Sequence, residues 1–298
     1  MSQSISSSKI KSALAPNIDL SRQNSESSNS LGDFIQETLA LTQRLFIQLQ
    51  RRPSTLIAGI IQPFMWLVLF GALFSKAPSG LFGTDLSYAK FLAPGVIVFT
   101  AFSGALNAGL PVMFDREFGF LNRLLVAPLS SRYSIVAAST VYIIALSFIQ
   151  TAVIIFASAV LGAGLPGFAG LSAIALIVFL IVLGVTALSL GLAFALPGHI
   201  ELIAVIFVTN LPLLFASTAL APLSFMADWL QVIASLNPLT YAIEPIRYIY
   251  SHGDWGINSL VMNTPWFGFS FGAVILVLLA FDALILLAIQ PLLRRRFA

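Results

Sequence analysis

Hydrophobic and polar positions along this chain are grouped in long blocks. A helix of about 20 apolar residues is needed to cross a hydrocarbon layer of ~30 Å. Six blocks meet that length: Thr55–Phe74, Phe91–Met113, Ser134–Leu161, Phe168–Leu196, Ile200–Ala221 and Trp266–Leu292. The pattern predicts an all-α integral membrane protein with six transmembrane helices.

The segment Asp33–Arg52 is too polar to cross a membrane, and Pro53 is expected to end it as a helix. Its apolar residues recur at near-helical spacing, with charged residues mostly elsewhere around the helix. The residues singled out on it are Phe34, Ile35, Leu39, Arg44, Phe46 and Leu49. This is typical of an N-terminal amphipathic helix lying in the membrane interface. The alternative is an amphipathic helix packed on a soluble partner.

The segment Pro222–Pro265, before the last block, holds two apolar stretches that are too short to cross. They are Leu223–Leu236 and Leu239–Tyr250, separated by Asn237 and Pro238. Stretches of 10–14 residues favour re-entrant or interfacial helices. Glu244 and Arg247 are three residues apart in the second stretch, so they can pair on one helix face. We favour a structural salt bridge there over substrate contact.

Composition supports one membrane domain. The chain is 58% hydrophobic and 9% charged, with a mean hydropathy of +0.95, whereas soluble domains carry about 25% charged residues. Residues 1–32 are polar and rich in Ser and Asn, without the apolar region of a signal peptide, and are predicted to be a disordered tail. The membrane domain is expected over 33–298, which leaves no room for a soluble catalytic domain.

The placement of positive charge predicts the orientation. With six spans, twelve of the 15 Lys and Arg residues fall on one side and three on the other. The three are Lys76, Lys90 and Arg247. Because Lys and Arg are retained on the cytoplasmic side, both termini are predicted to be cytoplasmic and Pro222–Pro265 external.

The loop Asp115–Arg132 carries five charges between two apolar blocks, and it is amphipathic and basic. By the same charge rule it is cytoplasmic. Its large apolar residues argue against a merely solvated basic loop, which is the alternative. The loop is therefore predicted to present a short helix to a partner.

A few polar or small residues inside the spans are candidates for function or for packing. Asn107, Asn210 and Asp282 are predicted as translocation sites or as structural hydrogen-bonding groups, and for Asp282 we favour the structural role. Small residues recur every four positions in the second and fourth spans: Ala101, Ala105, Gly109 and Ala187, Gly191, Ala195. This spacing favours close helix packing within the protomer, with a dimer seam as the alternative.

Several kinds of chemistry lack the necessary residues. None of the four lysines follows a glycine, so the chain has no P-loop for a nucleotide. With no cysteine and only His199 and His252, disulfides, thiolate nucleophiles and a dedicated zinc site are excluded or disfavoured. The chain is therefore not expected to be an enzyme or to hold a cofactor, and any energy for transport must come from another polypeptide.

These features resemble the membrane subunit of an ABC-2 type exporter, in the daunorubicin-resistance-like subgroup. The resemblance covers about residues 33–298. It rests on the helix Asp33–Arg52, on the segments DREFG (115–119) and RLLVAPL (123–129), on LNPLTYAIEPIR (236–247), and on six spans with both termini inside. The amino-acid sequence, especially over Leu45–Phe74, also resembles that of cyanobacterial and red-algal plastid members of the family.

The resemblance implies alternating access by two permease subunits, usually a homodimer. Two separate ATPase subunits would bind ATP and Mg, and the loop would contain a coupling helix. Its expected contact residues are Asp115, Arg116, Glu117, Phe118, Phe120, Leu121, Arg123, Leu124 and Leu125. An exporter in the cell membrane, moving a hydrophobic or amphipathic cargo such as a drug, lipid or lipid-linked glycan, is the implied function; no nucleic-acid partner is expected.

Two other functions would each require a sequence pattern of their own. A stand-alone secondary transporter needs coupling ions or an internal repeat, and an integral membrane lipid-modifying enzyme needs clustered Asp, His or Glu at one membrane face. Neither pattern is evident in this sequence.

Overall fold

Helices make up nearly all of the computed structural model, which describes residues 30–297 except 75, 77–86, 122–130 and 132. The long helices are α2 (Ser30–Arg51), α3 (Ser54–Leu73), α4 (Tyr88–Leu106), α7 (Tyr133–Ser158), α8 (Phe168–Ala195), α9 (His199–Phe215) and α12 (Phe271–Phe297). Shorter elements are α5 (Gly109–Glu117), the π-turn η2 (Ala159–Ala163), the 3₁₀ turn η3 (Leu223–Phe225), α10 (Asp228–Leu236), α11 (Pro238–Ser251), β1 (Leu260–Asn263) and β2 (Gly268–Ser270). The predicted tail, residues 1–32, lies almost wholly outside the described residues.

Five segments of the described chain are long and apolar enough to cross a membrane. They are Ser54–Leu73, Tyr88–Glu117, Tyr133–Ala163, Phe168–Ala195 and Phe271–Pro291. The remaining predicted span contains α9, an apolar helix of 17 residues. At 1.5 Å per residue it reaches about 26 Å, slightly less than the hydrocarbon layer, so a sixth crossing stays a prediction.

The last span begins later than predicted. The apolar pattern predicts a start at Trp266, but the helix starts at Phe271. The Thr264 backbone N–H and hydroxyl both bind the Phe267 carbonyl, at 3.1 and 2.7 Å, and this turn joins β1 to β2 in an antiparallel hairpin. The apolar residues before Phe271 therefore belong to a hairpin.

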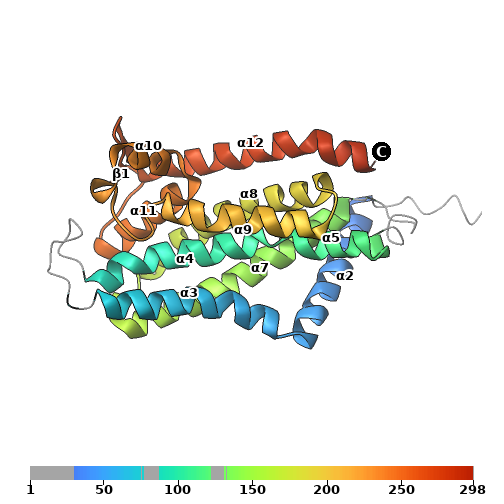
Figure 1. The fold of residues 1–298 in the computed structure, drawn as a ribbon, viewed down its shortest axis with the longest axis horizontal. Helices are drawn as coiled ribbons and strands as arrows, with labels where there is room; N and C mark the ends of the chain where they lie inside the picture. Colours follow the sequence, from blue (N-terminus) through green and yellow to red (C-terminus); the bar gives the residue numbers. More distant parts are fainter. Residues whose placement is uncertain (1–29, 75, 77–86, 122–130, 132, 298) are drawn as a thin grey trace, which may run out of the picture.

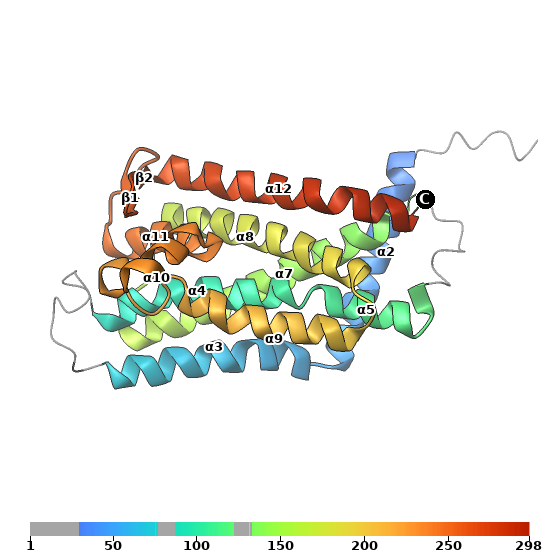
Figure 2. The same ribbon diagram turned by 45° about the horizontal axis from the view of Figure 1, so that its top comes forward.

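The long helices other than α2 run side by side, α2 crosses them at one end, and the connections gather at the two ends of the bundle (Figures 1 and 2). One end carries α2, the end of α5, the α8–α9 turn and the C-terminal end of α12. The opposite end carries α10, α11 and the β1–β2 hairpin. The described parts of the segments predicted to be cytoplasmic thus lie at one end, which we call the α5 end.

Helix α4 is the centre of the core: most of its residues are buried between α3, α7, α8 and α11. Close approach depends on glycine. A methyl group added at Gly95 would lie 2.4 Å from the Ala219 carbonyl oxygen, and one at Gly109 would lie 2.4 Å from that of Ser189. Gly109 and Gly191, which meets Ile289 of α12, both pack within the protomer. This is the first of the two roles predicted for the small residues.

The break between α4 and α5 is held by a hydroxyl of α8. Ser189 Oγ donates to the Leu106 carbonyl at 2.6 Å and accepts from the Gly109 N–H at 2.9 Å. Backbone groups freed at a helix break need such partners in an apolar environment. The second predicted span therefore continues through α5 as far as Glu117, past its predicted end at Met113.

Two short helices lie in the predicted external segment. Asn237 links them to the bundle: its Oδ1 accepts from the Leu239 N–H at 3.0 Å, and its Nδ2 donates to the Leu213 and Ala216 carbonyls at 2.7 and 2.6 Å. It thus caps the start of α11 and the end of α9 together. The re-entrant placement of α10 and α11 in a membrane stays a prediction.

Replacing Gly95 by alanine is expected to destabilise the protein by about 1–3 kcal/mol, because the new methyl would overlap backbone atoms of Ala219. Gly71→Ala is the matched control, since no atom lies within 4 Å of the added methyl there. SDS-induced unfolding in mixed micelles measures both. Equal stability of the two variants would contradict this packing.

Candidate functional site

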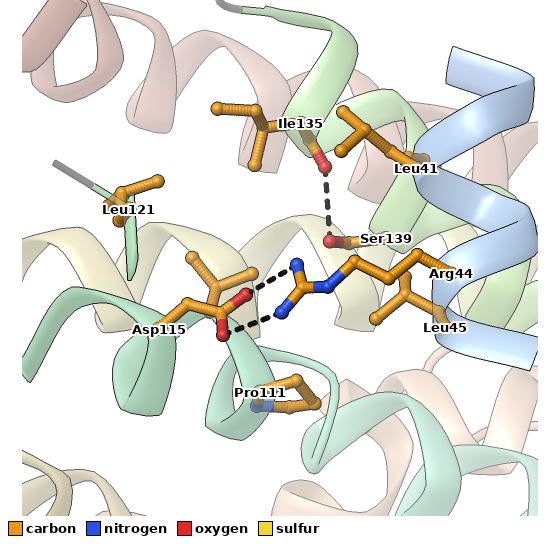
Figure 3. A pocket seen from close by; sticks show the side chains of 10 residues that line it. Leu41, Arg44, Leu45, Pro111, Asp115, Leu121, Ile135 and Ser139 are labelled. Carbon is orange, nitrogen blue, oxygen red and sulfur yellow. Dashed lines mark hydrogen bonds and ion pairs between the residues drawn. The ribbon is translucent and has the colours of Figure 1, made fainter. Parts of the chain in front are cut away.

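The clearest polar cluster that joins several elements lies at the α5 end. There, three consecutive charged residues each bind a different helix or turn. The first is Asp115. Arg44 of α2 donates to its Oδ2 from Nη1 and to its Oδ1 from Nη2, both at 2.9 Å (Figure 3). The Arg44 guanidinium also lies 3.9 Å from the centroid of the Phe120 ring. A bidentate pair fixes direction as well as distance, so it holds α2 in one orientation against α5.

Arg116 binds the end of α8. Its Nη1 donates to the Ala193 carbonyl at 2.8 Å, and its Nη2 donates to those of Leu196 and Pro197, each at 2.6 Å. The last carbonyls of a helix lack partners within the helix and carry partial negative charge. A guanidinium is therefore well suited to this position.

Glu117 binds the start of α9. It accepts from the His199 backbone N–H at 2.6 Å, and its other oxygen lies 2.5 Å from His199 Nδ1. The residue at the N-cap, Gly198, has no side chain to offer the free N–H groups, so Glu117 replaces it from another helix. Together, Asp115, Arg116 and Glu117 join α2, α5 and the α8–α9 turn; we call these three residues and Arg44 the α5 clamp.

The residues predicted to contact an ATPase occupy different environments. The three charges have partners within the chain, and Leu121 is 3% exposed among Val112, Ile135, Leu190 and Phe194. Phe120 lies beneath Arg44, whereas Phe118 stacks on Phe114 and is 80% exposed. Arg123, Leu124 and Leu125 lie outside the described residues. Contact of these residues with an ATPase stays a prediction, and Phe118 is the described apolar residue best placed for it.

Exchanging the charges of the Arg44–Asp115 pair tests the α2 attachment. Arg44→Asp or Asp115→Arg alone should lower stability, and the double exchange should recover about 1 kcal/mol of the combined loss. The partly exposed position of both side chains limits the expected size. A double-mutant cycle by SDS-induced unfolding measures it, and zero coupling energy would contradict the pair.

Helix α2 has a half-packed apolar face. Phe46 lies edge-on to Tyr142 at 5.2 Å, and Leu49 packs against the core. Phe34, nearer the start, is partly buried, but Ile35 and Leu39 are 57% and 61% exposed. The exposed part is free to meet a membrane interface, and that contact stays a prediction.

The predicted polar residues of α4 and α9 form hydrogen bonds. Asn107 Nδ2 donates to the Ser103 carbonyl of its own helix at 2.7 Å. Ser103 Oγ in turn donates to Asn210 Oδ1 of α9 at 3.2 Å. Both asparagines therefore have a structural partner, and their role in translocation is untested.

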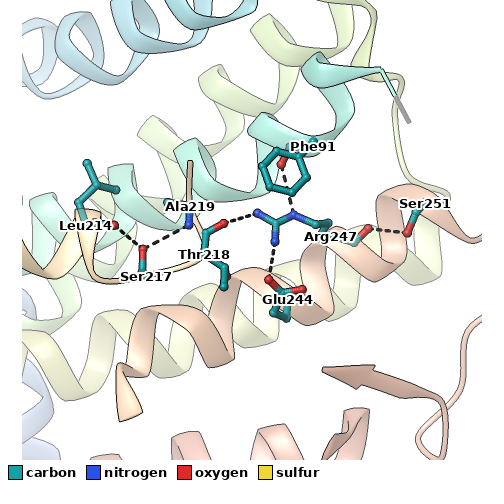
Figure 4. A network of polar contacts seen from close by, with 8 residues as sticks. All are labelled: Phe91, Leu214, Ser217, Thr218, Ala219, Glu244, Arg247 and Ser251. Carbon is teal, nitrogen blue, oxygen red and sulfur yellow. Dashed lines mark hydrogen bonds and ion pairs between the residues drawn. The ribbon is translucent and has the colours of Figure 1, made fainter. Parts of the chain in front are cut away.

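Arg247 and Glu244 pair at the opposite end, as the spacing predicted (Figure 4). Arg247 is 7% exposed and also donates from Nη2 to the Thr218 carbonyl and from Nε to the Phe91 carbonyl at 3.3 Å. Its guanidinium lies 4.0 Å from the centroid of the Phe91 ring. One side chain of α11 thus joins α4 and the segment after α9.

Asp282 is 4% exposed in the interior of α12, packed against Gly184 of α8. Neither of its carboxylate oxygens has a hydrogen-bond partner. No group of three or more His, Asp and Glu side chains gathers as a metal site would require among the residues that the structure covers. Asp282 thus belongs neither to a described metal site nor to the hydrogen bonds of the α5 clamp.

Replacing Asp282 by asparagine is expected to raise the free energy of unfolding by about 1–3 kcal/mol at pH 8, because it removes a buried charge without changing side-chain size. The exposed Asp254→Asn is the control and should change little. SDS-induced unfolding gives the comparison. Destabilisation by the Asp282 change would instead indicate a needed charge.

Sequence reasoning did not find the partners of the clamp. Arg44 and Asp115 are 71 positions apart, and Glu117 and His199 are 82 apart. A usable signal was present, since opposite charges were predicted on one side of the membrane in a chain with few charges. Charge placement predicts on which side of the membrane a residue lies, but it does not predict which acidic residue pairs with which basic one.

Known proteins resemble this chain over most of its length. A model of the ABC-2 type transporter family matches residues 36–250. The chain is 53% identical over 283 residues to ycf38 of Cyanophora paradoxa, named as a transport permease, covering 94% of this chain and 98% of that protein. It is 56% identical to ycf38 of Porphyra purpurea, over 89% and 91% of the two chains. DrrC of Mycobacterium tuberculosis, named as a doxorubicin resistance ABC transporter permease protein, is 26% identical over 74% and 79%.

Proposed function

The chain belongs to the ABC-2 type transporter family, and from that premise we propose that it is the permease subunit of an ABC exporter driven by a separate ATPase. The family and the apolar helices make it a membrane protein of transport-permease type. The α5 clamp is the observation that supports coupling to a partner at the α5 end.

The clamp connects the end of α5 rigidly to three other elements. A force applied to the end of α5 would pass to α2 through Arg44, to the end of α8 through Arg116 and to the start of α9 through Glu117. Charge-assisted hydrogen bonds of this kind are shorter and stronger than neutral ones, and the bidentate pair also fixes direction. Phe118, exposed directly after α5, supplies an apolar contact for the surface that pushes.

The proposed assembly has two copies of this chain and two ATPase subunits, which bind ATP and Mg. The α5 end and both termini face the cytoplasm, and the assembly sits in the cell membrane. Movement of the ATPase pair would open the permease pair alternately to the two sides. The scarcity of charge within the spans supports a hydrophobic or amphipathic cargo, the class that the DrrC name also suggests.

Co-purification tests the proposal. The full chain, tagged and isolated from its own cells in mild detergent, is expected to retain a soluble protein with a P-loop. Vesicles containing both should export a fluorescent amphipathic compound, with ATP required and vanadate inhibiting. Transport that needs an ion gradient but no ATP or second protein would instead support a stand-alone secondary transporter.

A further inference from the structure

A second polar site lies at the end of the bundle opposite the α5 clamp. A pocket of about 270 Å³ is bounded there by the start of α4, the α7–α8 turn and the end of α11. Its polar and aromatic lining comes from Lys90, Tyr250, His252 and Trp255, and much of the rest is glycine and apolar. At ~30 Å³ per water molecule, it has room for roughly nine waters, enough for a small polar headgroup.

Lys90 gives the pocket a positive charge that forms no ion pair with a described residue. It is partly buried, and the ion pairs found in the described chain involve other residues. Asp254, the acidic residue nearest in sequence to the lining, is not part of the wall. A lysine ammonium without an ion-pair partner is available to bind an anion.

The His252 ring and the N-terminus of α8 border the same space. His252 Nδ1 lies 2.9 Å from Ser251 Oγ and 3.3 Å from the Tyr248 carbonyl, which can only accept, so Nε2 donates to a ligand when the ring is in its imidazolium form. Helix α8, 28 residues long, starts at the pocket with Gly167 as an N-cap that makes no side-chain hydrogen bond. The first N–H groups of such a helix lack partners and attract negative charge.

The wall also contains a buried aromatic residue, with open space beside the neighbouring glycines. Tyr250 is 9% exposed, and its hydroxyl interacts with Ser158. The turn beside it leaves space, since Gly164 has a φ of +80° and no atom lies within 4 Å of a methyl group added there or at Gly167. The glycines therefore keep the pocket open and bring backbone close to any occupant.

The position of the pocket, at the ends of membrane-crossing segments, favours a lipid as its ligand. The membrane-crossing segments of α4, α7 and α8 begin or end beside it, at Tyr88, Ala163 and Phe168. Trp255 and Tyr250 have the amphipathic character of aromatic residues that sit at headgroup level. Ile249, Leu165 and Pro166 extend the lining with apolar surface suited to the start of an acyl chain.

We propose that this pocket binds the anionic headgroup of a phospholipid, held by Lys90, His252 and the N-terminus of α8. The proposal needs the chain to span a membrane but does not depend on an ATPase partner or on the cargo. Its failure and that of the exporter function are therefore distinguishable.

Binding to the purified full chain in neutral detergent tests the proposal. Short-chain phosphatidylglycerol, phosphatidylcholine and inorganic phosphate are titrated separately, with native mass spectrometry and the melting temperature as readouts. Phosphatidylglycerol is expected to bind and raise the melting temperature. Phosphatidylcholine should bind at least about tenfold more weakly, and phosphate should not reproduce the shift at equal concentration.

Variants connect the binding to the pocket. Lys90→Gln should weaken phosphatidylglycerol binding about tenfold, as expected for losing one charge-assisted contact, and Lys90→Arg should largely retain it. Lys76→Gln removes an exposed lysine that does not line this pocket and should have no effect.

Three outcomes would overturn the proposal. They are equal binding by the Lys90→Gln and Lys76→Gln variants, equal stabilisation by inorganic phosphate, and no preference of the unaltered chain for phosphatidylglycerol over phosphatidylcholine. The last comparison needs no variant, so it decides the matter even if the Lys90→Gln protein does not fold.

Discussion

Replacing Arg247 by leucine is expected to lower the free energy of unfolding by about 3–5 kcal/mol, the range for removing one partner of a buried ion pair. Glu244 would keep its charge with its guanidinium partner gone, and the Thr218 carbonyl would lose a donor (Figure 4). The packing of the guanidinium over Phe91 would be lost as well. SDS-induced unfolding of the purified variant measures the change.

Two comparisons isolate the cause. Replacing Glu244 by leucine in the same protein should restore part of the stability, because the unpaired carboxylate is then absent. Arg51→Leu, at the exposed end of α2, should change stability by less than about 0.5 kcal/mol. If the Arg247 and Arg51 variants proved equally stable, α11 would not be anchored by this network.

Replacing Phe118 by aspartate is expected to reduce ATP-driven transport about tenfold or more while leaving the protein folded. A single apolar anchor at the centre of an interface commonly carries 2 kcal/mol or more, and 1.4 kcal/mol corresponds to tenfold. Folding should survive because Phe118 is 80% exposed and, among the described aromatic rings, stacks on Phe114. The measurements are ATPase stimulation and export in vesicles containing the proposed partner.

Phe267→Asp is the matched control. That ring is 64% exposed in the hairpin at the opposite end of the bundle, and among the described rings it packs against Phe269. Transport should be unchanged by it. Equal activity of the two variants, with the partner still bound, would remove Phe118 from the coupling surface.

Much of the fold was predictable because crossing a membrane is a local property of the sequence. The lengths of the apolar blocks predicted α3, α7 and α8 closely, and Pro53 ends α2 at Arg51 as expected. The spacing of Glu244 and Arg247 predicted their pair, since residues three apart meet on one helix face. These inferences needed no knowledge of the neighbouring helices.

The boundary of the last span shows where local reasoning failed. An apolar run has the same composition whether it enters a helix or a hairpin, and the hydrogen bonds of Thr264 decide the matter. The sequence likewise did not predict which charged residues form pairs. Charge counting placed Arg44 and Asp115 on one face of the membrane, but many pairings satisfy that rule.

The sequence by itself determined that this chain is a membrane protein of several apolar helices, and it predicted that most of its Lys and Arg residues lie on one side of the membrane, because hydropathy and charge placement act residue by residue. Only the tertiary structure decided that α2, α5 and the α8–α9 turn are joined by the clamp, and that Lys90 and His252 line one pocket. Those contacts join side chains from different helices, so they depend on how the helices pack.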